Sequence, residues 1–300
     1  MAEPAQPGAV ARLRKIAAVV NSASGGVGPG AAAAVSELVA AHGYDLKVWD
    51  PAPHDLATSV RDAVATGPDL LLVLAGDGTA RLAAELCGPD GPLVAPLPGG
   101  TLNMLPHTLY GAVGWKDALA AALDHGVERP VSGGRVGGAT FYVAAILGAP
   151  ALWSHAREAM RAGKLDRAFR RARYALRRAF TGQVHFSLND GVSRQAEALV
   201  LITPKVSKAM HDEVALEVAG LDVHSAQETF RLAVNGLFGD WRRDPGVTTN
   251  FCTRGRVRAK HAIPCILDGE MQWLPRKVAF EFVPHAFRAL APPPAPRADA

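Results

Sequence analysis

The sequence has few cysteines and no long hydrophobic run, and both absences exclude whole classes of protein. Its three cysteines, Cys87, Cys252 and Cys265, are far apart and form no C-x-x-C pair, so we expect neither a zinc knuckle nor a disulfide framework. No window approaches the roughly 20 uninterrupted apolar residues that span a bilayer. No basic segment followed by an apolar core opens the chain. We therefore expect a protein of the reducing cytoplasm that is neither exported nor membrane-spanning.

An excess of charge of one sign is also missing. The chain has 32 Lys and Arg and 28 Asp and Glu, a formal net charge of +4. So mild an excess gives no argument for nucleic acid as a partner. The composition, 49% hydrophobic and 20% charged, is typical of a globular protein. The length of 300 residues amounts to about two average domains.

Several catalytic motifs are absent as well. The P-loop pattern G-x-x-x-x-G-K-[ST] does not occur, because Gly163-Lys164 is followed by Leu165, and no G-x-G-x-x-G is found either. The chain also lacks H-E-x-x-H and G-x-S-x-G. The sequence therefore gives no support for a Walker or Rossmann nucleotide site, a metallopeptidase or a serine hydrolase.

Between residues 12 and 130, short apolar runs alternate with Ala-rich and Leu-rich stretches of helical period. This alternation predicts an α/β domain, a doubly wound parallel sheet covered by helices on both faces. The predicted strands are 16–20, 45–49, 70–74 and 93–97, and the predicted helices are 30–42, 56–65, 79–87 and 115–124.

From residue 131 to 290 the pattern changes to short strand-like segments separated by turn residues, which predicts a second, mainly β domain. Its expected strands are 138–147, 183–188, 196–203, 214–218, 256–259, 263–267 and 277–283, with helical stretches near 151–180 and 225–238. Residues 1–11 and 291–300 are rich in Ala and Pro and lack apolar periodicity. We expect both segments to be flexible tails.

The apolar strand 70–74 ends in Ala75-Gly76-Asp77-Gly78-Thr79. Glycines remove the Cβ atom where the chain turns, so backbone N–H groups and a helix N-terminus can approach an anion closely. Asp77 would repel a phosphate unless a divalent cation lay between them, which favours a magnesium nucleotide. Taken alone, the motif is explained about equally well by an ordinary Gly-Asp-Gly turn.

Two further turns of small residues end neighbouring strands. Strand 93–97 is followed by Pro98-Gly99-Gly100-Thr101-Leu102-Asn103, and strand 16–20 by Asn21-Ser22-Ala23-Ser24-Gly25. Ligands of an open α/β sheet bind outside the carboxyl ends of its strands, so we expect these turns to face one crevice. Two Gly-rich turns at one edge favour a phosphate site more strongly than either turn alone.

These motifs resemble the diacylglycerol kinase catalytic family in its broad sense, which includes bacterial lipid kinases, sphingosine kinases and ceramide kinases. The family's G-G-D-G-T is similar to residues 75–79, its P-x-G-T-x-N to 98–103 and its N-P-x-S/A-G to 21–25. A late D-G-E of the family is matched by Asp268-Gly269-Glu270. The resemblance implies a two-domain lipid kinase, with ATP between an NAD kinase/diacylglycerol kinase-like α/β domain and a β-sandwich domain whose C-terminal segment packs back on the first.

The resemblance also implies roles for single residues. Asp77 would be catalytic by positioning Mg²⁺, directly or through water, and Glu270 would take the proton from the lipid hydroxyl. Without the resemblance, Asp268-Gly269 indicates a hairpin turn and Glu270 a surface residue. The expected nucleotide-binding residues are Asn21, Ser24, Gly25, Gly76, Asp77, Gly78, Thr79, Gly99, Gly100, Thr101 and Asn103.

Residues 157–178 contain nine Lys and Arg but only two acids, with apolar residues three and four apart. This spacing predicts a helix with one apolar and one basic face. A lipid substrate favours membrane docking, whereas the alternative is a core-packed helix with a solvated basic face. Few interleaved aromatic residues give little reason to expect RNA. The expected membrane-facing residues are Arg170, Arg171, Arg177 and Arg178.

We therefore expect an ATP- and Mg²⁺-dependent cytoplasmic kinase, peripherally attached to the inner face of the membrane. It would transfer the γ-phosphoryl group to a hydroxyl of a diacylglycerol-like or sphingoid/ceramide-like lipid. A homodimer is left open. The alternatives are a non-catalytic nucleotide- or lipid-binding relative and a kinase for a soluble acceptor such as NAD. Nicotinamide-nucleotide kinases share the G-G-D-G turn, but the P-G-G-T-x-N element favours the lipid branch.

Overall fold

The computed structural model describes residues 13–148, 151, 182–207, 209–210, 213–222, 242 and 246–294. The chain divides into two compact units: Met1–Val131 with His285–Ala300 form unit 1, and Ser132–Pro284 form unit 2. The helices predicted near 151–180 and 225–238 lie outside the described residues, apart from Ala151. The predicted membrane-facing arginines fall in the first of these stretches. Within the described ranges, no helix is both long and apolar enough to cross a membrane.

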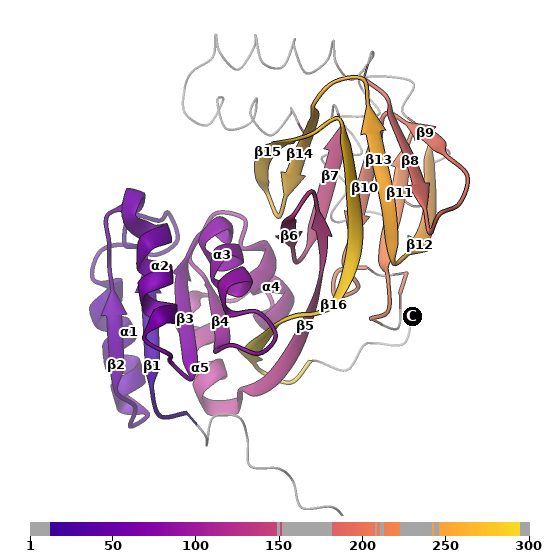
Figure 1. The fold of residues 1–300 in the computed structure, drawn as a ribbon. Coiled ribbons are helices and arrows are strands. Elements are labelled where there is room, and N and C mark those ends of the chain that lie inside the picture. Colours follow the sequence, from indigo (N-terminus) through magenta and orange to yellow (C-terminus); the bar gives the residue numbers. More distant parts are fainter. Residues whose placement is uncertain are drawn as a thin grey trace, which may run out of the picture. The chain divides into compact units, whose positions relative to one another are not determined.

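Unit 1 is built from alternating strands and helices (Figure 1). They are β1 (Ile16–Val20), α1 (Ala31–Ala41), β2 (Leu46–Trp49), the 3₁₀ turn η2 (Pro53–Asp55), α2 (Leu56–Ala65), β3 (Leu70–Ala75), α3 (Asp77–Cys87), β4 (Leu93–Pro98), α4 (Met104–Tyr110) and α5 (Trp115–His125). The strands form a parallel sheet in the order β2-β1-β3-β4, and the end of β16 (Lys277–Ala291) adds to β4.

Burial on both faces explains the continuous apolar runs of the central strands. All residues of β1 and β3 are buried, as expected of inner strands of a parallel sheet. In β1, Ile16 and Ala18 belong to the core that includes α1 and α5. The alternate residues Ala17 and Val19 are buried on the opposite face. The predicted doubly wound α/β fold is therefore confirmed.

Two features near the turns differ from the prediction. Helix α3 begins at Asp77 rather than at residue 79, because Ala80 already donates its N–H to the carbonyl oxygen of Gly76 (3.1 Å). Asp77 consequently lies in the first turn of the helix. Helix α4 is not among the predicted helices, and it starts directly after Asn103, whose φ of 51° breaks the extended chain.

The last part of β16 is fixed to unit 1 by side chains. Tyr110 Oη donates to the carbonyl oxygen of Leu290 (2.6 Å), and Arg129 Nη1 donates to that of Pro292 (3.1 Å). Ala291, expected in a flexible tail, is instead the fully buried last residue of β16. The tail prediction is wrong at this position because the strand continues into the core of unit 1.

Unit 2 is rich in strands, and β5 (Val127–Val136) and β16 pass from one unit to the other. One sheet has the order β12-β11-β10-β7-β14-β15, and the other places β13 between β16 and β8, with β9 beyond β8. The remaining strands are β6 (Ala139–Phe141), β7 (Ala144–Gly148), β8 (Val184–Leu188), β9 (Arg194–Ala196), β10 (Ala198–Ile202), β11 (Leu216–Leu221), β12 (Val247–Cys252), β13 (Arg254–Ala259), β14 (Ile263–Leu267) and β15 (Glu270–Leu274). The strand-rich second domain is confirmed.

Some strand predictions in unit 2 need correction. The segments 138–147 and 196–203 are each divided into two strands. The first division falls at Tyr142, whose N–H is bound by a side chain instead of a neighbouring strand. Strand β12 is missing from the prediction because it is an edge strand with only one buried residue, so it lacks a clear apolar alternation.

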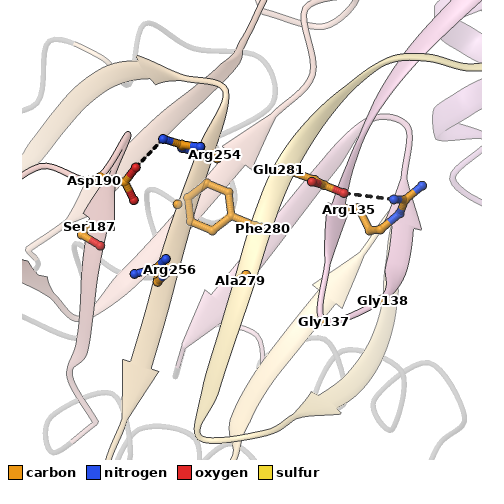
Figure 2. A pocket seen from close by; sticks show the side chains of 11 residues that line it. Arg135, Gly137, Gly138, Ser187, Asp190, Arg254, Arg256, Ala279, Phe280 and Glu281 are labelled. Carbon is orange, nitrogen blue, oxygen red and sulfur yellow. Dashed lines mark hydrogen bonds and ion pairs between the residues drawn. The ribbon is translucent and has the colours of Figure 1, made fainter.

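Strand β13 shows the two-sided character of its sheet. Arg254, Arg256 and Arg258 are exposed, while Gly255 and Val257 between them are buried. Successive side chains of a strand point to opposite faces, so the arginines share the outer face. A pocket of about 410 Å³ opens beside them (Figure 2).

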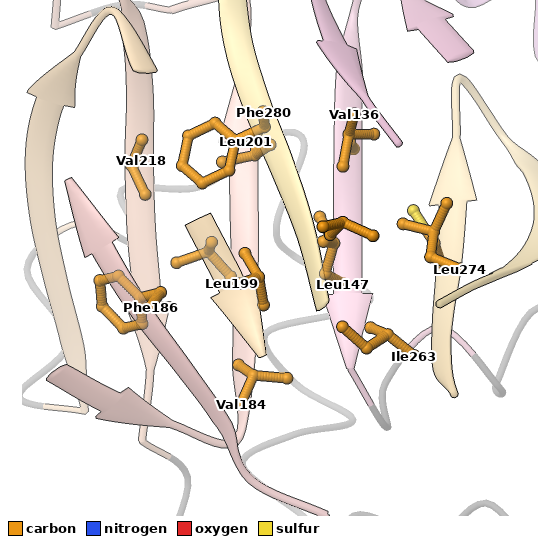
Figure 3. Packing of buried hydrophobic residues seen from close by; sticks show 14 of the residues in the cluster. Val136, Leu147, Val184, Phe186, Leu199, Leu201, Val218, Ile263, Leu274 and Phe280 are labelled. Carbon is orange, nitrogen blue, oxygen red and sulfur yellow. The ribbon is translucent and has the colours of Figure 1, made fainter. Parts of the chain in front are cut away.

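The apolar core of unit 2 lies between its two sheets (Figure 3). Phe186 of β8 and Phe280 of β16 pack with Leu199 of β10 and Leu147 of β7. A glycine makes this packing sterically feasible, since a Cβ atom at Gly255 would lie 2.3 Å from the Phe280 ring. Unit 2 therefore has a core of its own.

Candidate functional site

Three turns lie in direct contact at the carboxyl edge of the unit 1 sheet. They are residues 21–27 after β1, 75–79 after β3 and 98–103 after β4. Gly26 donates its N–H to the carbonyl oxygen of Gly99 (3.2 Å), and Ser24 Oγ donates to the same oxygen (2.6 Å). The structure thus brings together the three turns that contain all the sequence-predicted nucleotide residues.

Contact between the second and third turns depends on missing side chains. A Cβ atom at Gly99 would lie 2.8 Å from the backbone nitrogen of Ala75, and one at Gly100 would lie 2.9 Å from Cα of Gly76. Real Cβ atoms essentially never come within 3.0 Å of another heavy atom in this way. Any larger residue at either position would push the turns apart.

Asn103 holds the third turn in shape. Its Oδ1 accepts the N–H of Gly100 (2.7 Å), and its Nδ2 donates to the carbonyl oxygen of the same residue (3.2 Å). The left-handed φ of 51°, which asparagine tolerates better than most residues, aims the amide back at the turn. Between these two residues, the side chain of Thr101 is exposed to solvent.

The start of α3 offers backbone donors beside these turns. Gly76 is the N-cap, and Asp77, Gly78 and Thr79 form the first turn, all of them half-buried. The first N–H groups of a helix have no intrahelical acceptor and lie at the positive end of the helix dipole. A Cβ atom at Gly76 would meet no other atom within 4 Å, so open space lies next to the turn. This combination suits a phosphate group.

A metal ion here would need more ligands than the protein gives it. Asp77 supplies a carboxylate in the first turn of α3. Among the described residues, no cluster of three or more His, Cys, Asp and Glu side chains could hold a metal ion. Mg²⁺ is typically bound by one or two carboxylates together with substrate phosphates and water. The residues present therefore fit Mg²⁺ that arrives with a phosphorylated ligand.

A further carboxylate, which lies outside the sequence motifs, fixes the first turn. Asp50, directly after β2, accepts the hydroxyl of Ser22 at Oδ2 (2.9 Å) and the N–H of Ser22 at Oδ1 (3.3 Å). The signal in the sequence is an aspartate at the carboxyl end of a predicted strand next to β1. Asp50 thereby belongs to the same edge as the three turns.

In unit 2, Asp268 is a buried structural residue. Its carboxylate accepts three consecutive N–H groups, from Tyr142 (2.7 Å), Val143 (2.9 Å) and Ala144 (3.0 Å). Only 3% of the residue is exposed. The hairpin expected from Asp-Gly is present, but its aspartate is fixed to another strand and does not face solvent.

The same turn determines where Glu270 lies. Asp268 and Gly269 have φ values of 46° and 90°, and Glu270 pairs with Leu267 across this two-residue turn. Glu270 is exposed at the first position of β15. Its backbone is therefore held between the buried Asp268 and the β14–β15 ladder.

Replacing Asp268 tests this structural role. Asp268→Ala leaves two buried N–H groups and one partly buried N–H group without their acceptor, so the free energy of unfolding should fall by about 3 kcal/mol or more. Urea unfolding of the purified variant measures this change. The control Asp190→Ala removes an exposed carboxylate paired with Arg254 at a position that shares the left-handed backbone of Asp268 (φ of 60° and 46°). Both variants therefore have the same backbone cost, and the control should lose at least about 2 kcal/mol less. Equal stability of the two variants would contradict the assignment.

The part of the chain that contains the three turns matches the model of a protein family. Residues 15–136 match the family model of the diacylglycerol kinase catalytic domain. This range contains all three turns and ends before Asp268. The resemblance noted in the sequence is thereby confirmed. Among curated protein sequences, no significant match was found.

Solved structures agree with the fold. A diacylglycerol kinase from Bacillus anthracis strain Sterne is 17% identical with a TM-score of 0.65, and a candidate diacylglycerol kinase from the same strain is 19% identical with a TM-score of 0.69. Each comparison covers 94% of this chain and 98% of the other. An NAD kinase from Archaeoglobus fulgidus in complex with ATP is 10% identical with a TM-score of 0.51, covering 91% of this chain and 92% of the other. At these identities the likeness shows the fold alone.

Proposed function

We propose that the chain, whose residues 15–136 match the model of the diacylglycerol kinase catalytic domain, is an ATP-dependent lipid kinase. It transfers the γ-phosphoryl group of ATP to a hydroxyl of a diacylglycerol-like or sphingoid/ceramide-like lipid. The observation that carries the proposal is the contact of the three turns at Gly99 and Gly100, next to the N-terminus of α3. Backbone N–H donors grouped in this way can bind the phosphate chain of a nucleotide.

In this proposal each turn has a separate role in binding ATP. The N–H groups at the start of α3, around Gly76 and Gly78, bind phosphate oxygens, and Thr79 contributes its hydroxyl, because its N–H already donates to the carbonyl oxygen of Gly76 (3.1 Å). Gly25, where a Cβ atom would meet no other atom within 4 Å, leaves room for the phosphates, whereas Gly99 and Gly100 let the turns lie together. Thr101 offers an exposed hydroxyl. Asn21, Ser24 and Asn103 act as positioning residues, since the side chains of Asn21 and Asn103 bond within their turns and that of Ser24 bonds to the third turn.

Asp77 is the proposed residue for Mg²⁺. Bound with the nucleotide, Mg²⁺ would neutralise phosphate charge and orient the γ-phosphoryl group. The carboxylate of Asp77 lies in the first turn of α3, beside the N–H groups proposed to bind phosphate. It would hold the ion directly or through a water molecule, with phosphate oxygens as the other ligands.

Glu270 is the proposed general base. As the lipid hydroxyl oxygen bonds to the γ-phosphorus, the bond to the leaving ADP oxygen breaks and the hydroxyl proton passes to the Glu270 carboxylate. Two facts support this choice: the side chain is exposed, and its backbone is anchored by Asp268 and the β14–β15 pairing. A loose transition state removes the proton late, so a carboxylate of ordinary basicity is sufficient.

The acceptor binds in unit 2 in this proposal, and the product forms at the inner face of the membrane. The basic segment 157–178, with Arg170, Arg171, Arg177 and Arg178, is the sequence-based candidate for membrane contact. A soluble acceptor such as NAD is the second candidate, because the fold also resembles an NAD kinase. The TM-scores to the Bacillus anthracis structures are higher than the TM-score to the NAD kinase. This similarity of fold favours the lipid acceptor.

The most direct test incubates the chain with labelled ATP, Mg²⁺ and a panel of acceptors: diacylglycerol, sphingosine and ceramide in nonionic mixed micelles, and NAD in solution. We expect label in a lipid. Asp77→Asn should lower that turnover by about 100-fold or more through lost metal positioning, whereas the matched control Asp62→Asn on the exposed face of α2 should not. Label in NAD alone would refute a lipid acceptor, and no label in any acceptor would support a non-catalytic binding protein.

Replacing Glu270 tests the proposed base separately from nucleotide binding. Glu270→Gln keeps the size of the side chain but cannot accept the proton, so kcat should fall by about 100-fold to 10,000-fold. ATP affinity, measured by calorimetry on the same preparation, should hardly change. Glu37→Gln, an exposed glutamate of α1, is the control. A fully active Glu270→Gln enzyme would show that the base lies elsewhere.

A further inference from the structure

The outer face of one unit 2 sheet gathers positive charge outside the proposed catalytic residues. Lys277 of β16 and Arg135 of β5 join the exposed arginines of β13 on this side. We call these five residues the basic face: Arg135, Arg254, Arg256, Arg258 and Lys277. The concentration of charge contrasts with a net charge of only +4 for the whole chain.

Acidic neighbours neutralise only part of the basic face. Arg135 Nη1 pairs with Glu281 Oε1 (2.9 Å), and Arg254 pairs with Asp190. Both pairs are exposed, with 48% of the Arg135 and 67% of the Arg254 side chain accessible. Over the ranges that the structure describes, the other three cations, Arg256, Arg258 and Lys277, have no ion-pair partner.

The strand register makes this arrangement unfavourable for the fold itself. Arg258 lies directly opposite Lys277 on one side and His185 on the other. Like charges directly opposite each other destabilise a sheet. Arg256 lies between Ala279 and Ser187, which supply no negative charge. An external anion would therefore relieve the repulsion between Arg258 and Lys277.

The pocket in this sheet gives an anion access to Arg256. Figure 2 shows the Arg254–Asp190 pair on one side of the pocket and the Arg135–Glu281 pair on the other. Small residues, among them Ala279 and Ser187, leave a space of about 410 Å³. A phosphate group in this space would meet the forked guanidinium of Arg256, whose geometry suits phosphate.

We infer that the basic face docks onto an anionic phospholipid surface, with headgroup phosphates entering the pocket at Arg256. The inference rests on the proposed lipid kinase function, because a lipid acceptor requires the enzyme to reach a bilayer. None of the exposed residues of β13 or of the adjoining β16 residues 277–281 is aromatic. The face therefore lacks the stacking platform that single-stranded nucleic acids use, and the lipid surface is the better match.

The test is sedimentation with vesicles of phosphatidylcholine, with or without phosphatidylglycerol. The full chain should bind only the anionic vesicles, and about 0.5 M NaCl should release it by screening the exposed charges. The variant Arg254→Gln/Arg256→Gln/Arg258→Gln should lower the partition coefficient by about fivefold for each charge, or roughly 100-fold together. These substitutions lie on an exposed strand face and remove the like charge opposite Lys277, so the variant should unfold at a urea concentration no lower than that of the unmodified chain.

A charge-matched control separates this face from net charge. The variant Arg14→Gln/Arg61→Gln/Lys116→Gln removes three exposed cations of unit 1 and should bind vesicles within about twofold of the unmodified chain. Equal binding by the β13 variant and the unmodified chain would overturn the inference and leave segment 157–178 as the membrane contact. Binding to a single-stranded oligonucleotide but not to anionic vesicles would overturn it as well.

Kinase assays distinguish the proposal of membrane docking from the proposal of kinase function. In nonionic micelles the β13 variant should phosphorylate lipid at the rate of the unmodified chain, because it changes none of the proposed catalytic residues. Its rate on anionic vesicles should fall with its vesicle binding. If the unmodified chain binds anionic vesicles through this face yet phosphorylates no acceptor, docking is supported and the kinase function is refuted. If the unmodified chain phosphorylates a lipid but the β13 variant binds vesicles as tightly as the unmodified chain, the kinase function is supported and docking through this face is refuted.

Discussion

The absence of side chains at Gly99 and Gly100 is the constraint on which the candidate site depends. It lets the backbone after β4 lie against the backbone after β3, where a Cβ atom at Gly100 would come within 2.9 Å of Gly76. The carbonyl oxygen of Gly99 then accepts hydrogen bonds from the turn after β1. One close approach thus connects all three turns and fixes the surroundings of the α3 N-terminus.

The rest of unit 1 supports that approach. Parallel strands β1, β3 and β4 are neighbours with matched registers, so their carboxyl ends meet at one edge. Their complete burial leaves the sheet little freedom to adjust. In unit 2, Asp268 has a comparable role, because it fixes the hairpin that presents Glu270. In both units, polar side chains inside the turns determine the shape of the backbone that would meet the substrate.

Local patterns predicted much of this structure, and long-range contacts explain what they missed. The strands of unit 1 follow from their apolar runs, and the convergence of the turns follows from parallel topology. The buried partners of Asp268 lie about 125 residues away, so a sequence pattern indicated only a turn. Likewise, the hydroxyl of Ser24 is used by Gly99, 75 residues away. Edge strand β12 and helix α4 depend on neighbours more than on their own periodicity.

The contact between the turns is tested by the affinity of Gly100→Ala for ATP with Mg²⁺, determined by calorimetry. The added methyl group must displace the turns, so the dissociation constant should rise by about tenfold or more. Gly114→Ala is the control, because its Cβ atom would lie an ordinary 3.5 Å from the nearest side-chain atom, and its affinity should be unchanged. A folded Gly100→Ala protein that binds ATP as tightly as the control would contradict the claim that contact between the turns forms the nucleotide site.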